Sequence, residues 1–524
     1  MAIGNLVKNL QNIMRQDPGV NGDAQRIEQM VWIFFLKVYD AQEEDWECDD
    51  DDFKSIIPEE LRWRNWAHAK DASGKYRNDA YTGDSLLSFI NNRLFPVLKG
   101  NNVGDEEKGN FIEGIHVNSK TPRGKAVVQE VFLEVNNFMK NGTLLRQMID
   151  VVDEIDFTDT QDAHTFGDIY EGILKDLQGA GNAGEFYTPR AVTDFIIDRL
   201  RPQLGELIGD FAMGTGGFLV SALKYLKVQL DKSGHADDVE KYQNSIIGQE
   251  WKPFPYLLAV TNLLLHGIKH PNLRHMDSLG VPMSNYNHEG KVDVIAMNPP
   301  FGGSTEASVK NNFKAEYRSS ETADLFMVLI MQRLAQGGRA GVVLPDGFLF
   351  GTDGAKLAIK RRLLSEFNLH TIIRLPNSVF SPYASIATNI LFFDNERAED
   401  APENFATKET WFYRIDMPDG YKHFSKTRPM LLTHFNTALD WWDNRTEIVS
   451  EEAGEKSRCF KVEDLMAMDC NFDQCKFPKK EEEVLRPNEL LAQYHARRED
   501  MERVIDKMLE EIQLELGINT EKSV

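Results

Sequence analysis

The sequence predicts an α/β protein: a doubly wound sheet, preceded by an all-helical N-terminal domain and followed by a C-terminal helical tail. After about Asp156, short β-branched or apolar runs alternate with helical patterns. This alternation is typical of a sheet that binds ligands at the carboxyl ends of its strands. Before Asp156 the apolar residues follow helical spacing, and residues 489–516 form a charged helical pattern.

The chain has 524 residues, which is too long for one hydrophobic core, so we expect more than one domain. The changes in pattern divide it into residues 1–155, 156–430 and 431–524. The first would be helical, the second would hold the sheet, and the third would end in an amphipathic helix. That helix could pack on a partner or on the N-terminal domain of the same chain.

Helices are expected in the N-terminal domain at residues 25–44, 84–98 and 125–140. The middle of the first, 31–36, is apolar almost all round, so this helix should be buried. An acidic loop is expected to follow it at 45–52.

The second domain is expected to contain a series of short strands, most of them separated by helical patterns. They lie at residues 207–211, 245–249, 292–297, 339–344, 371–375 and 387–393. Helical patterns at 191–200 and through Leu226 flank the first strand.

The amino-acid composition further narrows the class of protein. The chain is 42% hydrophobic and 27% charged, which is ordinary for a globular protein. It has no run of about 18 apolar residues, and its first residues carry a single lysine, Lys8, without an apolar stretch. We therefore expect neither a membrane span nor a secretory signal, and a cytoplasmic location. The cysteines lack zinc-like spacing, so reduced thiols and no metal site are expected; they are Cys48, Cys459, Cys470 and Cys475.

The formal net charge is −23. Affinity for duplex DNA rests largely on contacts between Lys or Arg and phosphate, so this charge argues against a chain that grips long DNA by itself. If DNA is the substrate, a partner should supply much of the grip.

A glycine-rich turn follows the first strand, in the string Asp210-Phe-Ala-Met-Gly214-Thr-Gly216-Gly217. Glycines let the backbone turn tightly and approach a ligand closely. Asp210, at the strand end, could accept a hydrogen bond from a cationic or amine group. The spacing differs from the dinucleotide fingerprint, and by itself the motif fits a plain tight turn equally well.

Two acidic residues further along the chain are also candidate ligand contacts. Glu250 lies at the end of the second strand, where a carboxylate suits ribose hydroxyls. Asp277 could receive an adenine amino group. Taken singly, Glu250 fits a solvated strand-end charge and Asp277 an ordinary turn residue.

The strand at 292–297 runs into Asn298-Pro299-Pro300-Phe301. The prolines give a rigid, extended turn. The Asn298 side-chain oxygen and the carbonyl before the second proline can together accept both hydrogens of an exocyclic NH2 group. Phe301 offers a ring for stacking on an extruded base. The motif predicts an amine positioned for direct attack on an activated methyl group, without a strong base; the alternative is a proline-rich turn.

A further loop, Gly184-Glu185-Phe186-Tyr187-Thr188-Pro189-Arg190, precedes the helical pattern at 191–200. Thr188 or Pro189 could begin that helix, and the loop could fold over a bound ligand. Read alone, a helix N-terminus with no further role is the simpler interpretation.

Together these five features resemble the amino-methylating DNA methyltransferases that use S-adenosylmethionine. The order of the Phe186 loop, the glycine loop and Asn-Pro-Pro-aromatic is that of the family's gamma arrangement. Four longer strings resemble the modification subunit of type I restriction-modification systems: Trp32-Ile-Phe-Phe-Leu-Lys, Phe166-Gly-Asp-Ile-Tyr-Glu-Gly-Ile-Leu, Asp324-Leu-Phe-Met and Gly337-Gly-Arg-Ala-Gly-Val-Val-Leu-Pro345-Asp-Gly. The resemblance covers most of the chain and is strongest between Asp156 and Phe393.

The resemblance implies a Rossmann-like S-adenosylmethionine-dependent methyltransferase sheet in residues 156–430 and methylation of adenine N6 in duplex DNA. Asp277 would face the adenine of the cofactor, and Asn298, Pro299, Pro300 and Phe301 would hold the target amino group. The other cofactor contacts it implies are Glu185, Phe186, Tyr187, Thr188, Pro189, Arg190, Asp210, Gly214, Thr215, Gly216, Gly217 and Glu250. One departure is Phe211-Ala212-Met213, where the family often has Pro, Ala or Cys, and Ala or Ser.

The resemblance also implies partners. A specificity subunit would read the DNA site, with two modification subunits for each specificity subunit, and a restriction subunit could join. The acidic charge fits this division of labour. The chain has no Gly-x4-Gly-Lys-Ser/Thr phosphate loop, so a translocating ATPase is not expected on it.

Other functions remain compatible with the motifs. Asn-Pro-Pro-aromatic also occurs in methyltransferases that act on protein glutamine or on guanine amino groups of RNA. Those chains usually lack a large helical N-terminal domain and the loop at 184–190. A third hypothesis is an assembly subunit that keeps the fold without catalysis, against which the intact Asn298-to-Phe301 motif argues.

Overall fold

The computed structural model describes most of the chain. The described residues are 6–104, 109–118, 120–157, 167, 169–175, 187–286, 290–302, 305–352, 354–381, 386–425, 427–450, 454–478 and 487–515. The chain forms two compact units, Met1–Lys476 and Phe477–Val524. The first holds the N-terminal helices and the sheet, and the second holds the helix α19 (Pro487–Glu515).

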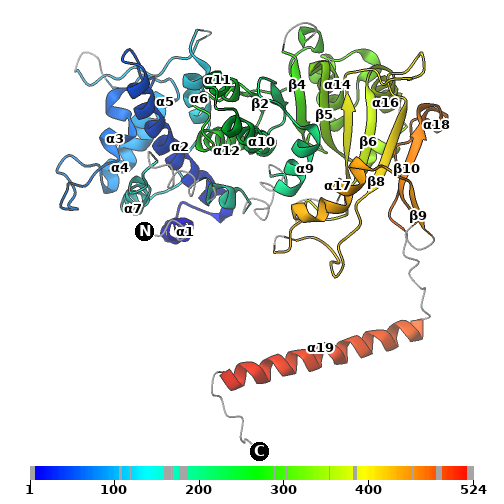
Figure 1. The fold of residues 1–524 in the computed structure, drawn as a ribbon. Helices are drawn as coiled ribbons and strands as arrows, with labels where there is room; N and C mark the ends of the chain where they lie inside the picture. Colours follow the sequence, from blue (N-terminus) through cyan, green and yellow to red (C-terminus); the bar gives the residue numbers. More distant parts are fainter. Residues whose placement is uncertain are drawn as a thin grey trace, which may run out of the picture. The chain divides into compact units, whose positions relative to one another are not determined.

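The N-terminal region is built from helices, drawn in blue to cyan in Figure 1. They are α1 (Leu6–Met14), α2 (Gly22–Asp49), η2 (Glu59–Leu61), α3 (Trp63–Trp66), α4 (Gly83–Phe89), η3 (Ile90–Leu94), α5 (Phe95–Leu98), α6 (Arg123–Phe132) and α7 (Gly142–Asp153). The middle of α2 is buried as its all-round apolar pattern predicts.

The acidic stretch that was expected to be a loop from residue 45 is helical as far as Asp49, so that prediction was wrong for its first five residues. The cause is Trp46, which is buried on this last stretch of α2. Its ring packs edge-on against Tyr39, at 5.5 Å between centroids, and stacks on His270 at 4.8 Å. Burial of this large ring holds the acidic turns in the helix.

The two other predicted helices differ from the structure in detail. Residues 83–98 are helical throughout, but η3 is a π turn just before Pro96, which has no N–H to donate within a regular α-helix. The helix predicted at 125–140 ends at Phe132. Beyond it, Phe138 N donates to Gln29 Oε1 at 2.9 Å, and Lys140 N donates to the Asp17 carboxylate at 3.0 Å. These side chains take the N–H groups that a longer helix would need.

A ten-stranded mixed sheet follows, in the order β3-β2-β1-β4-β5-β7-β6-β8-β10-β9. Strands β3, β2, β1, β4 and β5 are mutually parallel, whereas β7 is antiparallel to both β5 and β6. The strands are β1 (Ile208–Asp210), β2 (Ile246–Glu250), β3 (Leu273–His275), β4 (Val292–Met297), β5 (Leu334–Pro345), β6 (Asn368–Arg374), β7 (Thr388–Asp394), β8 (Glu409–Arg414), β9 (Ile448–Ser450) and β10 (Gly454–Lys461).

All six predicted strands are present, as β1, β2 and β4 to β7, and the predicted α/β class is confirmed. Sequence reasoning missed the other four strands. β3 and β9 have three residues each, too few for a periodic pattern. β10 is mostly polar and only half-buried. Because β9 and β10 belong to the same sheet, the sheet continues past residue 430; the three-domain division stays a prediction.

Helices cover both faces of the sheet, as Figure 1 shows. Alternate residues of β4 enter different cores: Val294 and Ala296 pack with α9, α10 and α12, whereas Ile295 and Met297 pack with α14 and α16. The helices of this region are α9 (Arg190–Leu200), α10 (Gly217–Ser233), α11 (Ala236–Gln243), α12 (Pro253–Leu265), η6 (Met283–Tyr286), α13 (Ala307–Lys310), η7 (Ala315–Tyr317), α14 (Thr322–Arg333), α15 (Asp346–Phe350), α16 (Gly354–Glu366), η8 (Leu432–Phe435), α17 (Asn436–Asp443) and α18 (Val462–Ala467).

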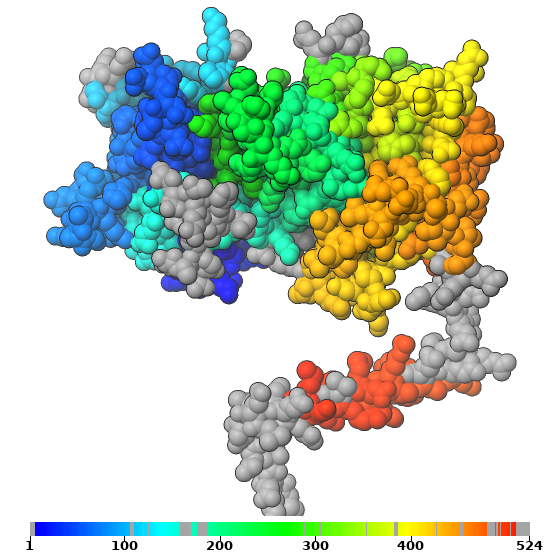
Figure 2. Space-filling view, viewed as in Figure 1, coloured from blue at the N-terminus to red at the C-terminus, as the bar shows by residue number. Residues whose placement is uncertain are grey.

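The N-terminal helices pack directly on the β3 side of the sheet. Helix α2 contacts α12, and α6 contacts β3. Polar contacts cross the same junction: Tyr256 Oη donates to Glu130 at 2.5 Å, and Lys269 pairs with Asp49 at 2.8 Å. Figure 2 shows the blue N-terminal residues and the green residues of α10 and α12 forming one continuous surface.

The second unit contains the predicted C-terminal helix, as the 29-residue α19. Its exposed apolar side chains are Leu491, Tyr494, Met501, Ile505, Met508 and Leu509. Among the described residues, no helix has the length and apolar character needed to cross a membrane.

Candidate active site

The carboxyl ends of β2, β1 and β4 lie side by side, because these three strands are adjacent and parallel. The sheet therefore brings Glu250, Asp210 and Asn298 to one edge. Their separations in sequence are large, and the order of the strands alone makes them neighbours. This is the edge at which an open α/β sheet binds its ligand.

Asp210 ends β1 with a fully buried side chain. Its Oδ1 accepts a hydrogen bond from Ala212 N at 3.1 Å, whereas Oδ2 is buried without a partner among the described residues. Burial raises the pKa of Asp210 well above its ordinary value; the Ala212 N–H opposes this rise and the nearby Glu250 charge adds to it. A buried acceptor of this kind suits an ammonium or amine group of a ligand.

The glycine loop connects β1 to α10. Gly214 and Gly216 have φ values of 53° and 78°, in the left-handed region where a side chain is strained. Gly217 begins α10, and a Cβ there would overlap the guanidinium of Arg190. Thr215 is buried, and its carbonyl accepts from Asn262 Nδ2 at 3.0 Å, which holds the loop on α12.

Glu250 fastens the glycine loop to β2. Its Oε2 accepts from Gly214 N at 2.9 Å, and its Oε1 accepts from Lys252 N at 2.8 Å. Burial raises the pKa of Glu250 to about 7, against the lowering effect of these backbone N–H groups. A ribose hydroxyl would meet an acceptor that is already oriented.

Asp277 lies half-buried in the turn after β3, where its Oδ1 accepts from Leu279 N at 2.9 Å. Sequence reasoning missed the next residue, Ser278, which is buried. Its hydroxyl lies 2.6 Å from the Phe211 carbonyl oxygen and 2.8 Å from Gln249 Oε1. Ser278 thus ties the turn to both the glycine loop and β2; a hydroxyl next to the acidic residue was the only signal for it.

The departure at residues 211–213 is explained by packing. The Phe211 ring is buried, with the Arg333 guanidinium over it at 3.9 Å. Met213 is buried over β2, where a Cβ on Gly248 would overlap its sulfur. Both side chains pack into the core, and the glycines that turn the loop remain in place.

Asn298 follows β4 directly. Its Nδ2 donates to Thr188 Oγ1 at 3.2 Å, whereas its Oδ1 is buried without a partner in the described part of the chain. Pro299 is buried and Pro300 is exposed. The half-buried Phe301 ring meets Phe380 edge-on, with 6.0 Å between centroids and 89° between planes. Phe380, which sequence reasoning missed, stands 79 positions away in the chain, so only the fold reveals the contact.

The loop before α9 lies beside Asn298 through Thr188. Tyr187 and Pro189 are buried, and α9 begins at Arg190. Glu185 and Phe186, two of the predicted site residues, lie outside the described residues.

Arg190 is held by Glu171, another residue that sequence reasoning missed as part of the site. Two guanidinium nitrogens donate to its carboxylate, at 2.6 and 3.0 Å. Burial opposes ionisation of Glu171, but the Arg190 charge and hydrogen bonds prevail and lower the pKa of that carboxyl. The Arg190 charge is therefore already neutralised, and the pair anchors α9 over the start of α10.

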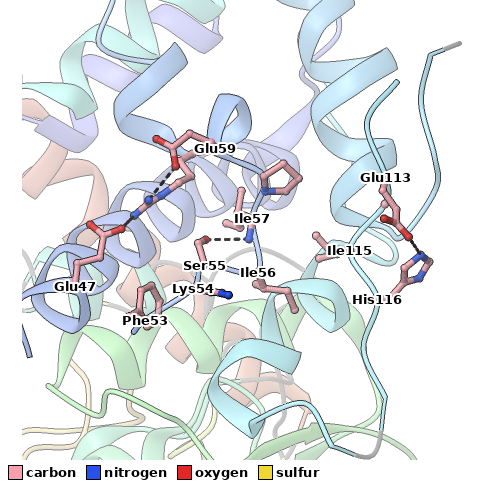
Figure 3. Close-up of a pocket in the computed structure, with 13 residues that line it drawn as sticks. Glu47, Phe53, Lys54, Ser55, Ile56, Ile57, Glu59, Glu113, Ile115 and His116 are labelled. Atoms are coloured by element: carbon pink, nitrogen blue, oxygen red, sulfur yellow. Dashed lines mark hydrogen bonds and ion pairs between the residues drawn. The ribbon is translucent and has the colours of Figure 1, made fainter. Parts of the chain in front are cut away.

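A hollow in the described part of the chain lies elsewhere. It has a volume of about 650 Å³ and is lined by the N-terminal region, including Lys54, Glu59 and His116 (Figure 3). None of the predicted site residues lines it. Arg62 at its wall is already paired with Glu47 at 2.5 Å and with Glu59 at 3.2 Å. These charged groups of the hollow therefore stabilise the folded chain. Among the described residues, no group of His, Cys, Asp and Glu could hold a metal ion.

The sheet order and the polar strand ends define a Rossmann-like methyltransferase that uses S-adenosylmethionine. Two family models match the chain: N-6 DNA Methylase over residues 161–484, and the HsdM N-terminal domain over residues 3–152. The chain belongs to the N-6 DNA methylase family. The resemblance inferred from the motifs is thereby confirmed.

Known relatives cover nearly the whole chain. The type I restriction enzyme EcoEI methylase subunit of Escherichia coli is 47% identical over 504 residues, which are 96% of each chain. A crystal structure described as a modification subunit of a type I restriction enzyme from Vibrio vulnificus YJ016 is 38% identical, with a TM-score of 0.71, over 88% of this chain and 92% of that one. A structure concerning complex assembly and conformational transition of the type I R-M system is 31% identical, with a TM-score of 0.75, over 98% and 99%.

Proposed function

We propose that Asn298, Pro299, Pro300 and Phe301 carry the chemistry of this adenine-specific DNA methyltransferase. The observation that supports this most is Asn298 Oδ1, which is buried just after β4 without a partner in the described part of the chain. A buried acceptor without a donor is costly, by roughly 1–3 kcal/mol. A target amino group supplies the missing donor.

In this mechanism the protein acts by positioning. Asn298 Oδ1 and the Pro299 carbonyl accept the two hydrogens of the adenine N6 amino group, which leaves the nitrogen lone pair facing the methyl donor. Phe301 stacks on the extruded base, and its edge-on contact with Phe380 fixes the tilt of the ring. The proton leaves after the nitrogen has become cationic, so no strong base is needed.

The remaining site residues would bind S-adenosylmethionine, which supplies an activated methyl group when bound. Asp210 Oδ2, which has no partner among the described residues, would accept from the ammonium of its amino-acid part, Glu250 suits the ribose hydroxyls, and Asp277 would face the adenine. The other residues assigned to the cofactor are Glu185, Phe186, Tyr187, Pro189, Arg190, Gly214, Thr215, Gly216 and Gly217, whereas the Thr188 hydroxyl contacts Asn298.

We further propose that the enzyme works in a type I complex with DNA, with two copies bound to one specificity subunit and a restriction subunit able to join. The relative from Escherichia coli is named a methylase subunit of such an enzyme. The net charge of −23 and the exposed apolar side chains of α19 support dependence on a partner. Residues 1–155, 156–430 and 431–524 would serve as helical, catalytic and partner-contacting regions. We propose that the complex works in the cytoplasm.

The test is tritium transfer from S-adenosylmethionine to adenine in duplex DNA, with the specificity subunit of the same system added. Asn298→Ala should lower the rate by about 100-fold or more, because it removes the acceptor for the reacting amine, and should leave cofactor affinity largely intact. Label that appears only in protein or RNA would contradict the substrate. An unchanged rate in Asn298→Ala would contradict the role of Asn298.

A further inference from the structure

We propose that Thr188 is a positioning residue for methyl transfer: its hydroxyl holds the Asn298 carboxamide with the carbonyl oxygen turned toward the target amine. This inference rests on the proposed function of Asn298. It gives Thr188 a role different from the cofactor contact that the sequence resemblance implies.

Two observations at Asn298 carry the inference. The nitrogen of the carboxamide donates to Thr188 Oγ1 at 3.2 Å, across 110 positions of sequence. The oxygen of the same carboxamide is buried and has no donor among the described residues. One end of the amide is thus engaged by the chain, and the other end is left for a ligand.

The target amine can bind only one of the two orientations of this amide. An exocyclic NH2 group offers hydrogens, so it needs the carbonyl oxygen, and an amide nitrogen in that place would repel it. When the oxygen faces the amine, the nitrogen points to the opposite side and needs an acceptor there. The Thr188 hydroxyl is that acceptor.

The backbone around Thr188 is suited to holding the hydroxyl still. Tyr187 and Pro189 on either side are buried, and Pro189 is the residue that directly precedes α9. The first residue of that helix, Arg190, is fixed by its two hydrogen bonds to Glu171. Thr188 therefore sits on a short segment that is anchored at both ends.

The test compares variants of the full complex on a duplex that the wild-type complex methylates. The rate of tritium transfer in a single turnover and the dissociation constant of S-adenosylmethionine are measured for each. Thr188→Val, which keeps the shape and loses the hydroxyl, should slow transfer by about 10- to 100-fold, as expected for a small misplacement of a reacting group. Thr188→Ser should keep the rate within about threefold, because it restores the hydroxyl. Cofactor affinity should stay unchanged in both.

Thr193→Val is the matched control. Thr193 lies on α9, which begins two residues after Thr188, and its hydroxyl bonds to Arg190 O at 3.0 Å and Ser221 Oγ at 2.8 Å. Its transfer rate should match the wild type. If Thr188→Val folds poorly, Thr188→Ala tests the same loss.

Different failures have different meanings. A wild-type rate in Thr188→Val, equal slowing in Thr188→Ser or Thr193→Val, or a loss confined to cofactor affinity would overturn this inference while the proposed function stands. An unchanged transfer rate in Asn298→Ala would instead overturn the proposed role of Asn298 itself.

Discussion

Individual oxygen atoms shape the chemistry of this enzyme at the residue scale. Asp210 and Asn298 each present one buried oxygen without a partner among the described residues, at the ends of adjacent strands. Because neither atom has a partner in that part of the chain, each would favour a ligand that brings a donor. Glu250 differs, because both of its oxygens already accept backbone N–H groups and it organises the glycine loop before any ligand arrives.

The raised pKa of Glu250 predicts a pH dependence of cofactor binding. Burial places this pKa at about 7, so Glu250 is ionised above that pH and protonated below it. The ionised form accepts ribose hydroxyls better, so affinity for S-adenosylmethionine should rise as the pH increases through 7. Glu250→Gln should weaken binding by about tenfold, as the loss of a charged acceptor implies, and should flatten the pH profile between about 6 and 8.

Calorimetric titration of both proteins across this range checks the prediction. The stability has the opposite dependence: because the folded pKa lies above the ordinary value of 4.5, the contribution of Glu250 is present below pH 4.5 and is lost as the pH rises through about 7. A wild-type profile that remains unchanged in Glu250→Gln would assign the titration to another group.

Helix–helix contact decides the geometry of the site at the scale of elements. The start of α10 passes so close to α9 that the Arg190 guanidinium occupies the space a side chain on Gly217 would need. The Arg190–Glu171 pair then holds α9 in place. The glycine at this position is therefore required by neighbouring protein atoms, independently of any ligand.

Gly217→Ala should displace Arg190, weaken its pair with Glu171 and destabilise the protein by about 1–3 kcal/mol, as overpacking does. Thermal melting should show the loss. Gly354→Ala is the control, because a Cβ there meets no atom and the residue begins α16; it should be neutral or slightly stabilising. Equal melting temperatures for Gly217→Ala and the wild type would show that Arg190 moves aside without cost.

Sequence patterns predicted the elements whose own residues contain the apolar run that buries them. The strands β1, β2, β4, β5, β6 and β7 have apolar runs of their own, and the polar residues at their ends pointed to the site. The early end of α6 was not predictable, since the N–H groups beyond it bond to Asp17 and Gln29, more than 100 positions away. The same limit applies to the site. The motif predicted Thr188 as a cofactor contact, but its hydrogen bond to Asn298 depends on the folded sheet.

The whole molecule consists of two compact units with different surfaces. The first contains the sheet, the site and the N-terminal helices, whereas the second contains α19 with its row of exposed apolar side chains. The overall charge of −23 disfavours direct attachment to DNA. Cofactor binding and DNA delivery are therefore expected to depend on different units.

A chain that ends at Lys476 tests this separation. It should bind S-adenosylmethionine as tightly as the full chain, because every predicted site residue precedes that position. It should lose stable association with the specificity subunit, and with it DNA methylation. Co-purification and calorimetric titration measure the two properties. Retained association in the shortened chain would place the contact in the first unit, and a loss of cofactor affinity would show that the units act together.

The unmet acceptor on Asn298 also has a consequence for substrate choice and turnover. If Asn298 Oδ1 and the Pro299 carbonyl each take one hydrogen, a base without an exocyclic amine leaves both oxygens without a donor, which is a strong penalty. Methylated adenine retains one N–H and satisfies only one of them. The two oxygen atoms that select the substrate would therefore also favour release of the product. Adenine that is already methylated would bind more weakly than unmethylated adenine.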